Sequence, residues 1–239
     1  MRVRIATLRN TDRVWFEELG ADAPWTRLWA GYVLCDCRGI RAVDSACPAC
    51  GSPPYDAASK TYVVDNHEIE IPCAFMGAEG RYEDYVFLRM LEREWKRPLR
   101  PSDLFLDMPE KERPAPRASI AMIFWTYLET RIERLLRACM RDVPARIVEE
   151  LLSRNVSISA RVGRVYNVLF ETTYWRDLED AGFLTVSTLL KRVRDCRNRF
   201  THGSPGALDD ELITEIVASL KREHESWIAV YNRRATLST

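Results

Sequence analysis

The sequence predicts a mainly α-helical protein, in which a C-terminal helical bundle of four to five helices follows a small α+β region. Two observations support this fold class. Apolar residues in the C-terminal half recur at three- and four-residue intervals over long segments, as in amphipathic helices. The N-terminal part differs, because four of the seven cysteines lie between residues 35 and 50, and this cluster indicates a separate small region. The expected boundaries are 1–97 for the N-terminal region, 98–116 for a proline-rich linker and 117–239 for the bundle.

Composition indicates a globular protein, because 46% of the 239 residues are hydrophobic and 10% are aromatic. No apolar run approaches the 18 residues of a membrane span, and Met1–Ile5 lacks the apolar core of a secretion signal. We therefore expect a cytoplasmic protein with no membrane association. Net charge is zero, but residues 131–199 hold fourteen Lys and Arg against nine Asp and Glu, a modest excess that suggests an anionic partner.

The N-terminal cysteines form a C-x-C and a C-x2-C pair separated by nine residues, after a strand-like segment at 3–5 and a possible short helix at 14–19. Without a secretory signal, such cysteines indicate metal binding or reduced thiols rather than disulfides. Four thiolates complete the tetrahedral shell of a Zn²⁺ ion and leave no position for water, so the zinc would be structural. The expected ligands are Cys35, Cys37, Cys47 and Cys50. Unligated thiols and an iron–sulfur cluster are the alternatives.

The string Cys47-Pro48-Ala49-Cys50-Gly51 resembles a zinc-ribbon knuckle, in which the glycine permits a backbone turn that points amides at sulfur. The first pair is one residue shorter than the usual C-x2-C, so the identity of one ligand stays open. His67 or Cys73 could substitute. Two short strands at 60–64 and 67–71, around the turn-forming pair Asp65-Asn66, complete the zinc-ribbon-like α+β region.

Beyond this region, apolar spacing predicts a helix at 79–97 that ends at Pro98. Five prolines among charged residues then mark the linker, 98–116. The bundle is expected to contain the helices 118–141, 144–153, 157–171, 184–200 and 209–233.

The helix at 184–200 carries the strongest functional signal. Its apolar positions are Val186, Leu189, Leu190, Val193, Cys196 and Phe200. At about 100° per residue, Arg197 falls within the arc of these apolar positions, whereas Arg194, Asn198 and His202 form a polar ridge beside it. A guanidinium on an apolar face must be paired or functional, so Arg197 either belongs to an internal ion pair or binds a ligand.

The string Arg197-Asn198-Arg199-Phe200-Thr201-His202 resembles the R-x4-6-H signature of the HEPN superfamily, in which a polar residue, often asparagine, follows the arginine. The resemblance covers roughly residues 117–235. It implies a helical bundle that dimerises with its motifs facing each other, a metal-independent endoribonuclease activity on RNA, and a role beside an antitoxin or an antiviral defence partner.

The same residues suit RNA cleavage on chemical grounds. Attack of a 2′-hydroxyl on the adjacent phosphate needs a base, an acid and cationic donors for the developing charge. An imidazole and a guanidinium supply these groups near neutral pH. We therefore take Arg197, Asn198 and His202 as candidate catalytic residues and Arg194 and Arg199 as candidate substrate-binding residues. The alternatives are that His202 only caps its helix, or that the protein binds nucleic acid or acts as a scaffold without catalysis.

Other candidates are interpreted as structural. Glu129 and Glu133, one helical turn apart, are expected on a solvated or salt-bridged face. His224 is expected on a charged helical surface with no functional role. The tryptophans of the bundle, Trp125, Trp175 and Trp227, are expected in the core rather than as platforms for bases.

Overall fold

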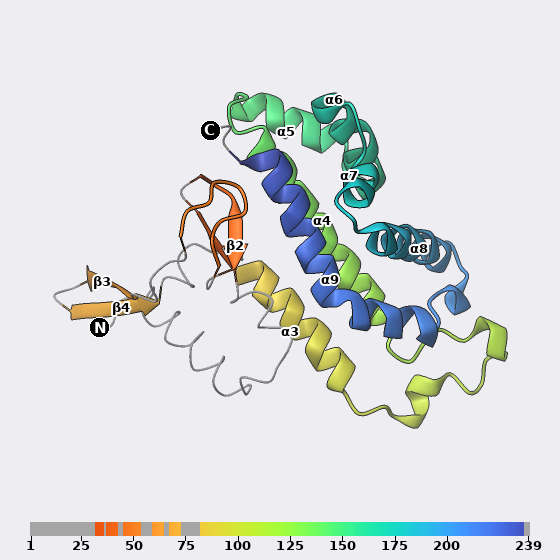
Figure 1. The fold of residues 1–239 in the computed structure, drawn as a ribbon. Helices are drawn as coiled ribbons and strands as arrows, with labels where there is room; N and C mark the ends of the chain where they lie inside the picture. Colours follow the sequence, from red (N-terminus) through yellow and green to blue (C-terminus); the bar gives the residue numbers. More distant parts are fainter. Residues whose placement is uncertain are drawn as a thin grey trace. The chain divides into compact units, whose positions relative to one another are not determined.

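The computed structural model describes residues 32–35, 37–42, 45–53, 59–64, 67–72 and 82–236. They belong to two compact units, one comprising the residues up to Arg89 with Thr236, the other spanning Met90–Ala235. Most of the described residues are helical (Figure 1), which confirms the mainly α-helical prediction. No described helix has the length and apolar character needed to cross a membrane.

The described strands of the first unit form two antiparallel pairs. Strand β1 (Tyr32–Leu34) pairs with β2 (Ile40–Ala42), and β3 (Ser59–Val64) pairs with β4 (His67–Pro72). The β3–β4 pair matches the strands expected at 60–64 and 67–71 to within one residue at each end. The expected strand at 3–5, the short helix at 14–19 and the turn at Asp65-Asn66 lie outside the described residues.

The helices follow the predicted order with one addition. They are α3 (Tyr82–Lys96), α4 (Ser119–Cys139), α5 (Ala145–Arg154), a π-helical segment (Ala160–Val165) continued by α6 (Tyr166–Phe170), α7 (Tyr174–Asp180), α8 (Leu184–Thr201) and α9 (Asp210–Ala235). Helix α7 is the addition. Its seven residues are too few to show a clear helical period, but its start is marked by Thr173, whose side chain accepts a hydrogen bond from the amide of Arg176.

Helices α4 and α9 form the centre of the second unit and lie side by side in Figure 1. Hydrogen bonds near both ends show that they run parallel: Ala115 N–H donates to Leu208 O (2.7 Å) before the two helices start, and Arg141 Nη1 donates to Ala235 O (2.9 Å) at their ends. The core between and around them is apolar. Its members include Ile120, Phe124, Leu128, Ile132 and Leu135 from α4, and Leu212, Ile216, Leu220, Trp227 and Tyr231 from α9.

A buried ion pair joins these two helices. Arg131 Nη1 lies 2.6 Å from Glu223 Oε2, and each side chain is only 1% exposed. The guanidinium lies over the rings of Tyr127 and Trp227, 4.7 Å and 4.5 Å from their centroids. Contact with two aromatic faces offsets part of the cost of desolvating the charge.

The segment expected as a linker, 98–116, belongs to the second unit. Two short 3₁₀ helices, η2 (Pro101–Leu104) and η3 (Glu110–Glu112), interrupt it. Arg97 fixes its start by ion pairs with Glu94 (2.9 Å) and Asp103 (2.7 Å). Most of its residues are exposed, but through η3 the segment contacts the chain that follows α8.

Candidate functional site

Helix α8 is amphipathic, as predicted. Its apolar positions Val186, Leu189, Leu190, Val193 and Cys196 are buried, whereas Phe200 is half-buried. The buried face packs against α4, α7 and α9. Because three helices hold the body of α8, the groups at its C-terminal end are presented from a rigid support.

The end of α8 has a defined geometry. His202 occupies the C-cap, and Gly203 follows with φ of 93°, a left-handed conformation that glycine adopts without steric cost. Gly203 N–H donates to Phe200 O (3.2 Å) and Ser204 N–H donates to Arg199 O (3.0 Å), the two bonds of a Schellman motif. The turn ends the helix directly after His202. The imidazole is exposed there.

Arg197 lies at the edge of the buried face rather than within the core. Its side chain is half-buried, its Nε is buried without a hydrogen-bond partner among the described residues, and its Nη1 donates to Asn198 Oδ1 at 3.3 Å. Among those residues it forms no ion pair, in contrast to the internal ion pair considered above. A buried guanidinium N–H without an acceptor is costly, so no partner among the described residues explains the position of Arg197.

The remaining candidate residues differ in how exposed they are and in whether they already have a partner. Asn198 and Arg199 are exposed, and Arg199 Nη2 donates to Cys196 Sγ at 3.1 Å. Arg194 is half-buried and pairs with its neighbour, the exposed Asp195, at 2.8 Å. Asn198 and His202 are one turn apart, and the amide of His202 donates to Asn198 O at 3.0 Å. The end of α8 thus carries exposed amide, guanidinium and imidazole groups beside the half-buried Arg197.

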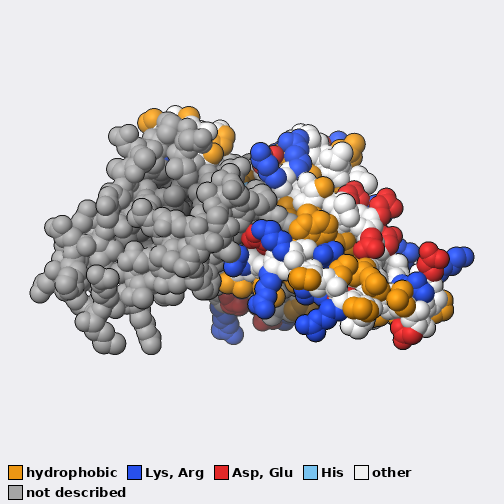
Figure 2. Space-filling view, turned by 90° about the horizontal axis from the view of Figure 1, so that it is seen from below, with side chains coloured by type: hydrophobic (Ala, Val, Ile, Leu, Met, Phe, Trp, Pro, Cys, Tyr) orange, Lys and Arg blue, Asp and Glu red, His pale blue; other side chains and the backbone are white. Residues whose placement is uncertain are grey.

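Much of the arginine excess is neutralised within the protein. Arginines of the bundle pair with acidic side chains at Arg131–Glu223, Arg137–Glu149, Arg161–Glu133, Arg192–Glu215 and Arg234–Asp177. On the face shown in Figure 2, basic, acidic and hydrophobic side chains are interspersed. The described residues of this face therefore form no broad basic surface.

The other candidates are largely structural, as expected. Glu133 is salt-bridged, Glu129 accepts a hydrogen bond from Trp125 Nε1 (2.8 Å), and Trp125 and Trp227 are buried. Trp175 is half-buried. The surface position expected for His224 was wrong, since its side chain is only 8% exposed. Helix α9 packs against both α4 and α8, which widens its buried face beyond the apolar positions.

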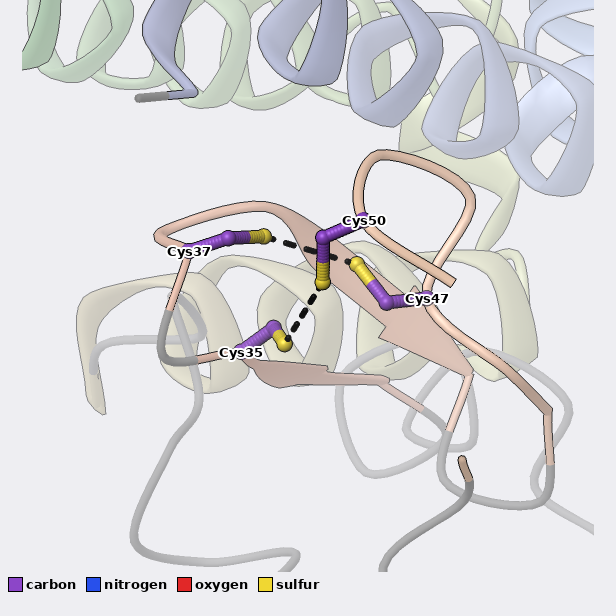
Figure 3. Close-up of side chains that lie close together, drawn as sticks. All are labelled: Cys35, Cys37, Cys47 and Cys50. Carbon is purple, nitrogen blue, oxygen red and sulfur yellow. Dashed lines mark hydrogen bonds between the residues drawn. The ribbon is translucent and has the colours of Figure 1, made fainter. Parts of the chain in front are cut away.

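In the first unit, the four predicted cysteines come together and point toward one another (Figure 3). Their sulfur atoms all lie within 4.8 Å of one another, with Cys35–Cys50 at 3.7 Å and Cys37–Cys47 at 3.6 Å. A disulfide would need about 2.05 Å. Four sulfurs placed tetrahedrally at about 2.3 Å from a metal lie about 3.8 Å apart, close to these distances. The cluster can therefore hold a metal ion.

Two loops of similar construction present the cysteines. In the first, Cys35 N–H donates to Gly39 O (2.7 Å); in the second, Cys47 N–H donates to Ser52 O (2.9 Å). In each loop the residue after the second cysteine is left-handed, Arg38 with φ of 67° and Gly51 with φ of 72°. The C-x-C loop thus makes the same turn with one residue fewer. Its Gly39 N–H points at Cys37 Sγ, 3.4 Å away.

Two residues of this site carry no sequence signal that could have found them. Arg41, which is buried, donates from Nη1 to the carbonyl oxygens of Ser52 (3.2 Å) and Pro53, and so ties the second loop to β2. The Ser52 hydroxyl lies 3.0 Å from Cys50 Sγ. Hydrogen bonds from Ser52 lower the pKa of Cys50 to about 6, whereas burial raises the pKa of Cys37 to about 12.

The side chains of the alternative ligands His67 and Cys73 lie outside the described ones. His67 begins β4, and Cys73 lies outside the described residues. The four nearby thiols suffice for a tetrahedral site without either of them.

Comparison of the chain with protein-family models, with curated proteins and with solved structures finds no match.

Proposed function

We propose that this protein is a metal-independent endoribonuclease of the HEPN type, with Arg197, Asn198 and His202 as its catalytic residues. The observation that carries the proposal is the arrangement at the end of α8. A half-buried guanidinium with an unpartnered N–H lies beside an exposed asparagine, and a Schellman turn ends the helix directly after the residue that carries the exposed imidazole. These groups match the requirements of phosphodiester cleavage by a 2′-hydroxyl.

In the proposed reaction, His202 accepts the proton of the 2′-hydroxyl as its oxygen forms a bond to phosphorus. The bond from phosphorus to the 5′-oxygen breaks, and that oxygen receives a proton from a general acid. Arg197 donates hydrogen bonds to the phosphate oxygens, whose negative charge grows in the transition state, and Asn198 orients the phosphate or the imidazole. Arg194 and Arg199 bind neighbouring phosphates. The products carry a 2′,3′-cyclic phosphate and a free 5′-hydroxyl.

This proposal is tested by incubating the chain with end-labelled RNA in excess chelator. We expect fragments that end in a 2′,3′-cyclic phosphate, because no step requires a metal. Intact RNA of reduced mobility would instead support the alternative, a non-catalytic nucleic-acid-binding or scaffold protein that uses the same surface.

We also propose that the active form is a homodimer in which two such sites face each other. One Arg–His pair supplies one proton-transferring group and one guanidinium, whereas two facing pairs supply a base, an acid and two guanidinium groups. Sedimentation at tens of micromolar should show a dimer. Full nuclease activity in a preparation that contains only monomer would contradict this geometry.

We propose that Cys35, Cys37, Cys47 and Cys50 bind one structural Zn²⁺ in a zinc-ribbon-like site, supported by the sulfur distances and the paired loops. Elemental analysis of purified protein should give one zinc per chain, and the double variant Cys47→Ser with Cys50→Ser should lose it. Cys139→Ser is the matched control, since Cys139 lies in α4 and its Sγ donates to Arg234 O. Less than about half an equivalent of zinc, or zinc retained in the double variant, would rule out the site.

A further inference from the structure

A polar cavity of about 490 Å³ lies beside the end of α8. It is lined by Lys111, Glu112, Arg199, the segment 203–207 and Asp209. Its volume falls in the range of about 300–1,000 Å³ that is common for small-molecule sites. Arg197, Asn198 and His202 do not line it, but Arg199 and Gly203 lie on either side of His202 in the chain.

The cavity walls are held together by close backbone packing. Helix η3 packs against η5 (Pro205–Ala207), and a Cβ added to Gly206 would overlap the carbonyl oxygen of Lys111 and lie 3.1 Å from its carbonyl carbon. A glycine is therefore required at position 206 for the backbone of η3 to approach so closely. The Ala115–Leu208 hydrogen bond holds the same two segments together beyond η3 and η5.

The charged groups of the cavity are available for a ligand. Within the described part of the chain, Lys111 and Glu112 are exposed and form no ion pair, and Arg199 donates only to Cys196 Sγ. Asp209 is partly used, because its Oδ1 accepts a hydrogen bond from the amide of Leu212 (2.8 Å) at the start of α9. The cavity thus offers two cations and one carboxylate with both oxygens available.

The two cations and the carboxylate suit a nucleotide whose base has two adjacent N–H donors. The cations match a phosphate, and the guanidinium of Arg199 can also stack on a base. A carboxylate only accepts hydrogen bonds, so Glu112 favours a base edge with two adjacent N–H donors. Guanine presents such an edge at N1 and N2. Uracil presents one N–H between two carbonyl oxygens, which a carboxylate repels.

We propose that this cavity binds a guanosine nucleotide of the RNA substrate next to the phosphate that is cleaved. Three residues of helix place Arg199 about 60° around the axis from His202, on an adjoining face. A nucleotide held by Lys111, Arg199 and Glu112 therefore continues toward the imidazole. The inference rests on the proposed nuclease function for its substrate, while the binding it describes does not depend on cleavage.

Binding is measured by calorimetry on the full chain carrying His202→Ala, with GMP and UMP as probes. GMP should bind at least about 10-fold more tightly than UMP, as expected for a charge-assisted hydrogen-bond pair. Glu112→Gln should remove most of this preference, and Lys111→Ala should weaken both nucleotides alike. Glu110→Gln, in the same 3₁₀ turn but outside the lining, is the matched control and should change neither. Equal affinity for GMP and UMP, or a preference unaffected by Glu112→Gln, overturns the proposal.

A second arm distinguishes RNA from free nucleotide. The His202→Ala chain should bind a short single-stranded RNA with one guanosine more tightly than its all-uridine counterpart, and Glu112→Gln should abolish the difference. GMP binding that depends on Glu112 without this RNA preference would overturn the assignment to RNA, because it indicates a site for free nucleotide. Failure of the nuclease proposal is seen separately, as absence of cleavage by the wild-type chain.

Discussion

Arg197→Ala should lower the rate of RNA cleavage by at least about 10²-fold, as removal of one preorganised donor to a developing oxyanion does in other enzymes. Arg197→Lys should recover little of this loss. A lysine keeps the charge but cannot present two parallel N–H groups to a phosphate. Comparing Arg197→Ala with Arg197→Lys therefore separates bidentate phosphate recognition from the effect of charge alone. The cleavage rate of each variant is measured by single-turnover cleavage of labelled RNA.

Because Arg197 is half-buried, its replacement can also affect folding, so the melting temperature of each variant is measured beside its activity. Arg192→Ala is the matched control on the same helix. Arg192 is comparably exposed and pairs with Glu215 at 2.7 Å, and we expect full activity without it. If Arg197→Ala loses activity only in proportion to the folded protein lost, Arg197 has a structural role and the catalytic assignment fails.

A large effect on stability is expected at Asp177, which is 1% exposed and joins α6, α7 and α9. Its carboxylate accepts hydrogen bonds from Arg234 Nε and Nη2, both at 2.6 Å, and from the hydroxyl of Tyr166. Removal of one partner of a buried ion pair costs about 3–5 kcal/mol. Asp177→Asn should lower the free energy of unfolding by an amount of this order, measured by urea denaturation.

The same network predicts a pH dependence. Burial alone would raise the pKa of Asp177, but hydrogen bonds from Arg234 and Tyr166 and the charge of Arg233 lower it below its usual value. The carboxylate therefore contributes stability above its unfolded pKa of about 3.9, and this contribution is lost as pH falls through the lower folded-state pKa. The stability difference between wild type and Asp177→Asn should be full near neutral pH and shrink in strong acid.

Glu150→Gln is the control for this experiment. It removes the ion pair between Glu150 and Arg154, whose side chains are 60% and 77% exposed respectively. The variant should leave the free energy of unfolding nearly unchanged at every pH. An Asp177→Asn variant as stable as this control would show that the buried network contributes little to the fold.

The fold could be predicted where long periodic patterns or dedicated side chains determine local structure. Helices α4, α8 and α9 follow directly from apolar spacing, because burial of one face dominates their stability. The observed end of α8 at Thr201 lies within one residue of the predicted end, and the positive φ of Gly203 explains why the helix stops there. The cysteine cluster could also be predicted, since both loops bring thiols close together through local turns.

Other features could not be predicted because they depend on contacts between distant residues. The burial of His224 and the Arg131–Glu223 pair arise from the packing of α9 against α4, which charge pattern alone does not show. The cavity beside α8 requires Lys111, nearly ninety residues before Arg199, to be brought there by the packing of η3 on Gly206. The proline-rich segment 98–116, which contains Lys111, resembles a linker in sequence because it has little regular structure of its own.

The cleavage rate of His202→Ala in excess chelator shows directly whether the imidazole of His202 transfers protons during RNA cleavage. We expect a rate at least about 10²-fold below that of wild type, with an unchanged melting temperature because the side chain is exposed at a helix end. If His202→Ala cleaves RNA at the wild-type rate, His202 only caps its helix, and the proposed catalytic mechanism is wrong.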